Sequence, residues 1–424
     1  MKKILIITYF FPPCNLAGSY RLSSWARYLH HFGFYPIVIT RHWNNDDSTY
    51  TSISNEKEIT IKKFETYEVH YIPYDGNLRD KLLSKTGIHY NLITKFLSLI
   101  ELILHHFMMI ATPSKGLYYY AKNILSNDSN ISLLLISGRP FILFRFGYLL
   151  KKKNHNIQWI ADYRDPWNTD WWYKNDIPIF LRKLESYSEK KWLSNAETFL
   201  TCSEKWKTDI QYYINKKGHV IYNGYEDSDK QYFDSHRSNT AEFTIVHNGS
   251  LYGIFSIEMF IEAIKKTINN GHIKIKVLFP GVENDTEEAN RIRSAIQGYE
   301  QYFELSKRIP HTELIQKMTN AQLLVLFGTK KLGGWIPLKL FEYLASGIPI
   351  LYCPDDEPII SEIIQQTNTG YTASSIADTI GILELQYSYW EKGINIILNP
   401  NRKAIECYSR MNQAKNLAEV LLSL

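Results

Sequence analysis

The sequence predicts an α/β protein built from two Rossmann-like, doubly wound domains that face a cleft. A strand–loop–helix–strand order opens the chain between residues 4 and 40, and the same order restarts between residues 243 and 279. The length of 424 residues also favours two domains over one. We therefore place a first domain at residues 1–224, a charged and polar linker at 225–240 and a second domain at 241–400.

The first domain opens with an apolar strand, 4–9, which ends at a Pro-Pro pair. A loop of small residues leads to a helix over about 20–32, and a second strand follows at 35–40. Ligands of doubly wound sheets bind at the carboxyl ends of the strands, where this loop lies. The loop lacks the GxGxxG fingerprint, which argues against a nicotinamide cofactor.

Residues 41–90 look polar and irregular, and a mostly apolar stretch follows at 92–111. Two charged residues and the adjacent His105 and His106 interrupt that stretch, so it does not suit a transmembrane span of about 20 apolar residues. We expect an amphipathic helix that is either buried in the domain or lies on a membrane. Because adjacent histidines lie on different faces of a helix, the pair is a poor metal motif.

A group of charges follows the strand that begins at Trp159. Asp162, Arg164 and Asp165 stand within the string ADYRDPW. Charged groups are costly to bury, so a cluster at the carboxyl end of a strand normally marks a functional site. The alternative interpretation is an internal Arg–Asp salt bridge that shapes the loop.

The second domain begins with a strand at 243–247 and a glycine-containing loop at 248–253, before a helix over 257–268. Backbone N–H groups of this loop, at Gly249 and Ser250, can hold a diphosphate. A further strand is expected at 273–279.

The most informative stretch lies between residues 323 and 352. An apolar strand, a Gly-Gly loop, a helix from Leu338 and a second apolar strand follow one another, with Gly347 at the end of the helix. Lys339 lies near the helix N-terminus, and Glu342 lies one turn later on the same face. A lysine and loop amides there suit a phosphate, and the carboxylate suits ribose hydroxyls. The alternative is a solvated Lys–Glu pair.

The string PLKLFEYLASGIPIL resembles the donor-binding segment of GT-B glycosyltransferases, especially the large retaining family 4. ADYRDPW is similar to a segment of a bacterial subgroup of these enzymes, and surface-polysaccharide assembly fits that resemblance. The family carries a Glu-x7-Glu pattern whose second Glu binds the ribose. Glu342 matches that position, but Gly334 stands at the first, so this chain departs from the family pattern where the donor sugar is usually contacted.

The resemblance implies which residues form the site. Arg164 falls where many relatives have a histidine near the donor sugar, and it can stabilise the leaving diphosphate, with Asp162 or Asp165 orienting it or an acceptor hydroxyl. The implied donor-binding residues are Gly18, Arg21, Gly249, Ser250, Arg308, Pro337, Leu338, Lys339 and Glu342. Relatives also carry an Arg and a Lys where this chain has 254–256, so the phosphate charge must be met by Lys339, Arg308 or Arg164.

The same resemblance implies sugar transfer from a nucleotide-diphosphate-sugar to an acceptor hydroxyl, with retention and without a metal or cofactor. A UDP- or GDP-linked donor is expected over others. In the family the last helix, here about 401–424, crosses back to the first domain. Two alternatives remain open: a non-catalytic GT-B subunit that binds a partner glycosyltransferase, and a sugar-nucleotide epimerase.

The charge distribution suggests an anionic partner. The first 220 residues carry 29 Lys and Arg against 19 Asp and Glu, whereas the remainder is acidic. This favours a lipid-linked or polysaccharide acceptor and an anionic membrane surface, or else reflects solubility alone, and no nucleic acid is expected.

Other features of the chain indicate neither a metal nor a disulfide framework. Four widely separated cysteines favour a reducing compartment, and no signal peptide is visible. We expect a cytoplasmic protein, peripheral at the inner face of the cytoplasmic membrane. The acidic run at 355–357 looks metal-like, but a solvated loop is the preferred interpretation.

Overall fold

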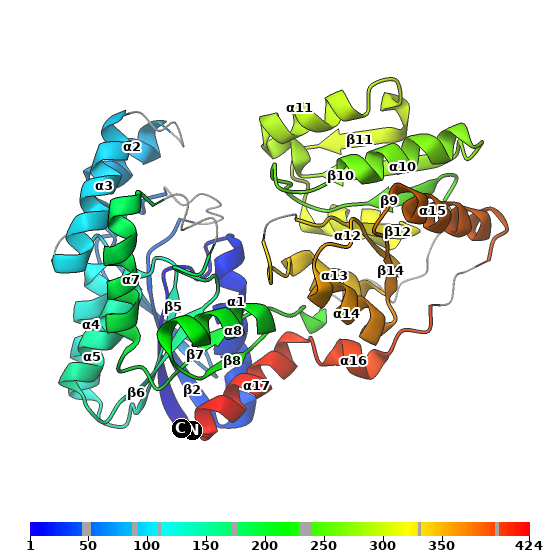
Figure 1. Ribbon diagram of the computed structural model, residues 1–424. Helices are drawn as coiled ribbons and strands as arrows, with labels where there is room; N and C mark the ends of the chain where they lie inside the picture. Colours follow the sequence, from blue (N-terminus) through cyan, green and yellow to red (C-terminus); the bar gives the residue numbers. More distant parts are fainter. Residues whose placement is uncertain are drawn as a thin grey trace. The chain divides into compact units, whose positions relative to one another are not determined.

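The computed structural model describes residues 1–44, 52–86, 92–108, 112–170, 177–228, 240–329, 332–394 and 398–424. It divides into two compact units, the first formed by residues 1–222 with 410–424 and the second by residues 223–409 (Figure 1). Each unit contains a mainly or wholly parallel β-sheet with helices, so the predicted α/β fold with two parallel-sheet domains is confirmed.

The elements of the first unit are β1 (Lys2–Ile7), α1 (Ala17–Tyr28), η1 (Leu29–Phe32), β2 (Phe34–Arg41), β3 (Thr60–Lys63), β4 (Glu68–Ile72), α2 (Leu78–Thr86), α3 (Leu92–Phe107), α4 (Lys115–Asn127), β5 (Leu133–Gly138), α5 (Ile142–Lys153), β6 (Gln158–Tyr163), α7 (Ile179–Leu193), β7 (Thr198–Thr201), α8 (Glu204–Ile214), β8 (Gly218–Val220) and α17 (Arg410–Leu422). The strand order is β3-β4-β2-β1-β5-β6-β7-β8, and β3 is antiparallel to β4 while the other pairs are parallel. The order reverses between β1 and β5, which is where such sheets bind ligands.

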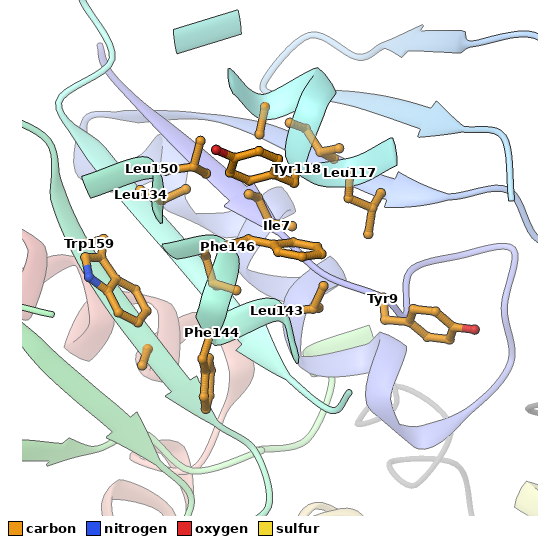
Figure 2. Packing of buried hydrophobic residues seen from close by; sticks show 14 of the residues in the cluster. Ile7, Tyr9, Leu117, Tyr118, Leu134, Leu143, Phe144, Phe146, Leu150 and Trp159 are labelled. Atoms are coloured by element: carbon orange, nitrogen blue, oxygen red, sulfur yellow. The ribbon is translucent and has the colours of Figure 1, made fainter. Parts of the chain in front are cut away.

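The sheet of the first unit is buried on both faces because its strands are apolar at successive positions. Leu5 and Ile7 belong to one core cluster, and Ile4 and Ile6 belong to the other. Figure 2 shows the first cluster, in which side chains of α4 and α5 pack on the sheet. A Cβ atom on Gly147 of α5 would come within 2.7 Å of the Trp159 ring, so glycine lets this helix approach the sheet closely.

The elements of the second unit are β9 (Phe243–Val246), α10 (Glu258–Asn269), β10 (Ile275–Pro280), η3 (Val282–Asn284), α11 (Thr286–Ala295), η4 (Glu300–Tyr302), β11 (Phe303–Ser306), α12 (His311–Thr319), β12 (Leu323–Leu326), α13 (Leu338–Ser346), β13 (Ile350–Tyr352), α14 (Pro358–Thr367), β14 (Gly370–Thr372), α15 (Ile376–Glu391) and α16 (Arg402–Glu406). The sheet is parallel, with the order β11-β10-β9-β12-β13-β14. Its order reverses between β9 and β12, so the loops after these two strands lie at the expected ligand position.

The stretch 41–90, which the sequence predicted to be irregular, contains β3, β4 and α2, so that prediction was wrong. Strand β4 pairs with β2 through registers such as Val38 with Val69, and Val69 is fully buried. The strand is only five residues long and mixes charged and apolar side chains, which weakens its periodic signal.

The single helix expected over 401–424 is two helices, α16 in the second unit and α17 in the first. Residues 407–409 separate the two helices, and Tyr408 packs within the second unit. Its ring packs 5.7 Å from that of Phe341, and its carbonyl accepts a 3.1 Å hydrogen bond from the backbone N–H of Tyr225. Helix α17 then packs against α1, with Leu417 buried in the same core cluster as Ile4 and Ile6.

The expected helix is α3, and it is only partly covered by its unit, which does not fit the first of the two alternatives, a helix buried in the domain. Leu92 is 85% exposed and Phe96 is 62% exposed, and the buried side chain of the helix is Thr94. Among the helices of the described residues, none combines the length and the hydropathy that a membrane span requires.

Candidate active site

Arg21 and Asp162 form a buried ion pair at the point where the first sheet reverses its strand order. Arg21 donates from Nε and Nη2 to Asp162 Oδ1, at 3.2 and 3.1 Å, and from Nη1 to the Ile221 carbonyl at 2.5 Å. Ser137, on β5, donates to the other carboxylate oxygen at 2.7 Å. The two charged side chains are 2% and 0% exposed. Their hydrogen bonds tie α1, β5 and β6 together, as a buried ion pair must to offset desolvation.

Arg164 and Asp165 form a second pair that is less deeply buried. Arg164 Nε donates to Asp165 Oδ2 at 3.0 Å, and the side chains are 15% and 25% exposed. Burial alone would raise the pKa of the Asp165 carboxyl, but the charges of Arg164 and Arg139 outweigh it and lower that pKa. The internal Arg–Asp salt bridge weighed from the sequence is therefore present.

Gly18 lies directly against Arg164. A Cβ atom on Gly18 would come within 1.9 Å of Arg164 Nη1 and 3.0 Å of the Phe10 ring. The guanidinium carbon also lies 5.6 Å from the centre of that ring. The first turn of α1, which begins at Ala17, thus needs a residue without a side chain at position 18 to admit the arginine.

Arg139 belongs to the same group of charges as Arg164 and Asp165, although it was not among the residues predicted from the sequence. Its Nη2 donates to Asp170 at 3.1 Å, its Nε lies 3.9 Å from Asp165 Oδ2, and its side chain is 39% exposed. The signal was available, because Arg139 follows a buried strand in the same way as Arg164.

Two buried glutamates of α7, one turn apart, hold the segment that carries Arg164. Glu189 accepts from the Tyr163 hydroxyl at 2.8 Å and from the Asn168 backbone and side chain at 3.2 and 2.6 Å. Glu185 accepts from Trp167 Nε1 at 2.7 Å. Burial raises the pKa of Glu189 to about 7. Sequence reasoning missed both residues, since nothing in a helix of mixed charge marks which carboxylates face inward.

Lys339 is the centre of the site in the second unit. It stands in the first turn of α13, as predicted, and its Nζ lies 2.9 Å from the Ser250 carbonyl and 3.0 Å from His247 Nε2. His247 is fully buried, and its Nδ1 lies 2.8 Å from the Val325 carbonyl. The ring therefore donates from Nδ1 and accepts from the lysine at Nε2.

Glu342 lies one turn beyond Lys339 and is half-buried. Asn248 Nδ2 donates to its carboxylate at 3.2 Å. Tyr343 in turn donates to the Asn248 side-chain oxygen and accepts from the Asn248 backbone, both at 3.0 Å. The loop after β9 thus contacts both charged residues of α13, unlike a solvated Lys–Glu pair.

The predicted glycine loop is shaped by close approach. Gly249 has φ +77°, and a Cβ atom on it would lie 3.3 Å from Lys339 Cε. A Cβ atom on Gly281 would lie 3.1 Å from Gly249 Cα, so the loops after β9 and β10 nearly touch. Both positions favour glycine. The Gly249 N–H donates to the Pro280 carbonyl at 2.8 Å, so this predicted diphosphate donor is already paired.

Gly334, at the position of the missing first Glu, has a structural role. It adopts φ +84° and its N–H donates to Glu357 Oε2 at 2.6 Å. In the same acidic run, Asp356 accepts from Thr329 N–H and Asp355 accepts from Ser361. These three acids hold the loop after β12 and the start of α14, and the run has defined hydrogen-bond partners within a partly exposed loop.

The remaining predicted donor-binding residues fall into two groups, one beside Lys339 and one apart from it. Pro337 precedes α13 as its N-cap and Leu338 begins the helix, so both lie beside Lys339. Arg308 is exposed after β11, where its backbone N–H donates to Asn284 Oδ1 at 3.3 Å. Within the described part of the chain, no contact joins Arg308 to the Lys339 group.

No protein-family model matches the chain, and no curated protein matches it significantly. Solved structures do match. The chain is similar over its full length to 99% of a sucrose-phosphate synthase from Thermosynechococcus elongatus (13% identity, TM-score 0.63). It is equally similar to all of Anabaena HepE in complex with UDP (12%, 0.63), and to 99% of an E. coli trehalose-6-phosphate protein bound with UDP-2-fluoro glucose (10%, 0.62).

At these identities the likeness shows the fold. The chain has the GT-B fold of nucleotide-sugar-dependent glycosyltransferases, as the resemblance predicted. Membership of family 4 and of the surface-polysaccharide subgroup stays a prediction.

Proposed function

We propose that this protein is a glycosyltransferase that moves a sugar from a nucleotide-diphosphate-sugar to an acceptor hydroxyl. The observation that carries the proposal is the arrangement around α13. Lys339 and Glu342 project from one turn of the helix and contact the loop after the neighbouring strand β9. This arrangement supports the proposal, because a cation and a carboxylate lie beside the loop that follows β9, where ligands of such sheets bind.

In the proposed donor complex, the Lys339 ammonium and the Ser250 N–H bind the diphosphate, because the Gly249 N–H already donates to the Pro280 carbonyl at 2.8 Å. Glu342, oriented by Asn248, accepts hydrogen bonds from the ribose hydroxyls. A UDP-linked donor is preferred over a GDP-linked one, since two of the similar structures carry UDP or a UDP-sugar. Arg308, which is exposed after β11, stays a predicted donor-binding residue.

For the transfer step, the proposal uses Arg164 to stabilise the leaving diphosphate and Asp165 to hold Arg164 in place. The acceptor oxygen bonds to the anomeric carbon as the bond to the diphosphate breaks, and the hydroxyl proton passes to a diphosphate oxygen. Retention follows from the family resemblance. Arg21 and Asp162 act as positioning residues, because both are buried. Side-chain cations neutralise the diphosphate, so transfer requires no added metal.

The acceptor is proposed to be lipid-linked or a polysaccharide at the inner face of the cytoplasmic membrane. Several large apolar side chains on α3 and α7 are exposed, at 61–85%: Leu92, Ile93, Phe96, Phe107, Ile179 and Phe180. An apolar surface on a basic domain suits an anionic membrane.

A non-catalytic subunit is the second candidate, because Gly334 replaces the first Glu of the family pattern. The position of Glu357 argues against a non-catalytic role. Its carboxylate lies 2.6 Å from the Gly334 N–H, so a carboxylate is present next to the altered position. Transfer of sugar by the purified protein would exclude the non-catalytic role.

The first test is a thermal-shift screen of the purified protein against UDP, GDP, ADP, dTDP and CMP. A ligand that binds the folded state raises the melting temperature by mass action. We expect UDP to stabilise the wild type and to lose this effect in Glu342→Ala. Glu262→Ala is the matched control, since Glu262 forms an exposed i,i+4 pair with Lys266 in the same unit. The assignment of the donor site is wrong if no nucleotide stabilises the wild type, or if UDP stabilises both variants as much as the wild type.

A further inference from the structure

A cluster of metal-ligating side chains lies where α3 meets α7. His105 and His106 come from the last turn of α3, and Glu185 comes from the middle of α7. One ligand atom from each residue lies within 4.8 Å of the other two. Glu185 Oε1 is 2.6 Å from His106 Nε2 and 3.7 Å from His105 Nε2. An adjacent histidine pair is a poor metal motif by itself. Here Glu185, on a second helix, adds a third ligand atom close to both rings.

The cluster is removed from solvent. Glu185 is fully buried, His106 is 1% exposed and His105 is 15% exposed. His105 Nε2 is buried and has no hydrogen-bond partner, although it points toward a buried carboxylate. Such an orphaned nitrogen is costly, and a bound cation would satisfy it.

Each remaining ligand is oriented by a second contact. His106 Nδ1 lies 2.5 Å from the Ser188 hydroxyl, and the second oxygen of Glu185 accepts from Trp167 Nε1 at 2.7 Å. Outer contacts of this kind fix ring tautomers and carboxylate orientation in metal sites. The nearby positive group is Arg145, which donates to the His105 carbonyl. A second buried carboxyl group, that of Glu189, lies one turn from Glu185 on α7.

We propose that His105, His106 and Glu185 bind one divalent transition-metal ion, with Zn²⁺ as the best match. Two imidazole nitrogens and a carboxylate oxygen form a common zinc ligand set, with a fourth position left for water. Both ligand atoms of the 2.6 Å pair must stand about 2.0 Å from a tetrahedral ion, so that pair opens by roughly 0.7 Å on binding.

The site would fasten α3 to its unit. Most of this helix is partly or largely exposed, so it has few apolar contacts to hold it. A metal between α3 and α7 replaces them with strong ligand bonds. Through Glu185 and Trp167, the same ion braces the segment that carries Arg164 and Asp165. The inference does not depend on the proposed sugar transfer.

The test uses the full chain without a histidine tag, stripped with a chelator and dialysed. Calorimetric titration with Zn²⁺ is expected to give one ion per chain. A thermal-shift measurement is expected to show a higher melting temperature when Zn²⁺ is bound. Titration with Co²⁺ is expected to give visible absorption bands of a tetrahedral site. His105→Gln should weaken Zn²⁺ binding by at least roughly tenfold and abolish the thermal shift.

The matched control is His31→Gln, which alters the second adjacent histidine pair of the chain, on η1. We expect it to bind Zn²⁺ like the wild type. Failure of the wild type to bind Zn²⁺ or Co²⁺ at micromolar concentrations would overturn the proposal, whatever the variants do. Wild-type-like binding by a folded His105→Gln would also overturn it.

Discussion

Lys339 Nζ lies 3.0 Å from His247 Nε2, and the lysine helps to keep the histidine neutral. Burial and the neighbouring lysine hold the pKa of His247 well below its ordinary value, so the ring stays neutral and accepts the hydrogen bond. Burial lowers the pKa of Lys339 to about 7, although Glu342 acts in the opposite direction. The cation proposed to bind the diphosphate is therefore only partly charged near neutral pH.

Donor binding is expected to weaken as the pH rises above 7. Only the ammonium form attracts the diphosphate, so the apparent Kd for UDP should rise roughly fivefold between pH 7 and pH 8. Calorimetry in buffers of different ionisation enthalpy should detect proton uptake on binding. Lys339→Met should bind more weakly and lose both effects. An unchanged pH slope in this variant would contradict the prediction.

Gly18→Ala should impair transfer while leaving the fold intact. The added Cβ would occupy the space of Arg164 Nη1, and the guanidinium is a flexible end that can move aside. Displacement of a reacting-site group by about 1 Å can cost on the order of 100-fold in rate. We expect a loss of that size in kcat/KM with a nearly unchanged melting temperature.

Gly381→Ala is the control for this change, because a Cβ atom at Gly381 on α15 meets nothing within 4 Å. Full activity in Gly18→Ala would show that the position of Arg164 is unimportant for transfer.

Asp162→Asn should destabilise the first unit. The substitution leaves the buried Arg21 guanidinium without its counter-charge, which typically costs about 3–5 kcal/mol. Urea unfolding measures this loss. Asp209→Asn should change stability by less than about 1 kcal/mol, since its pair with Lys205 is exposed. Equal effects of the two substitutions would contradict the buried-pair assignment.

Stability should depend on Glu189 between pH 4.5 and pH 7. Its pKa in the fold is raised to about 7 from an ordinary value of 4.5, so the folded state binds more protons in this range. The contribution of the protonated form, about 3 kcal/mol, is fully present below pH 4.5 and is lost as the pH rises through 7. Glu189→Gln should remove this dependence and be more stable than the wild type at pH 8.

Urea unfolding at several pH values measures the effect. A wild-type slope that persists in Glu189→Gln would assign it to another group.

The sequence was sufficient to place Lys339 and Glu342, because strand, loop and helix signals locate a first helical turn beside a sheet edge. It also brought Gly18 and Arg164 into one group, on the resemblance. It could not show that His247 holds Lys339, nor that Glu185 and Glu189 support the Arg164 segment. Those contacts join residues far apart in the chain, and which face of a helix turns inward depends on the complete packing.

The packing of α17 on α1 has a consequence for synthesis. The first unit is discontinuous in the chain, since its last helix is separated from the rest by residues 223–409. While the ribosome translates the second unit, the apolar side chains that α17 covers, among them Leu22 and Trp25, lack their native partner. The first unit therefore cannot complete its core until the helix at 410–422 has left the exit tunnel. During that interval its exposed apolar surface is a target for chaperones.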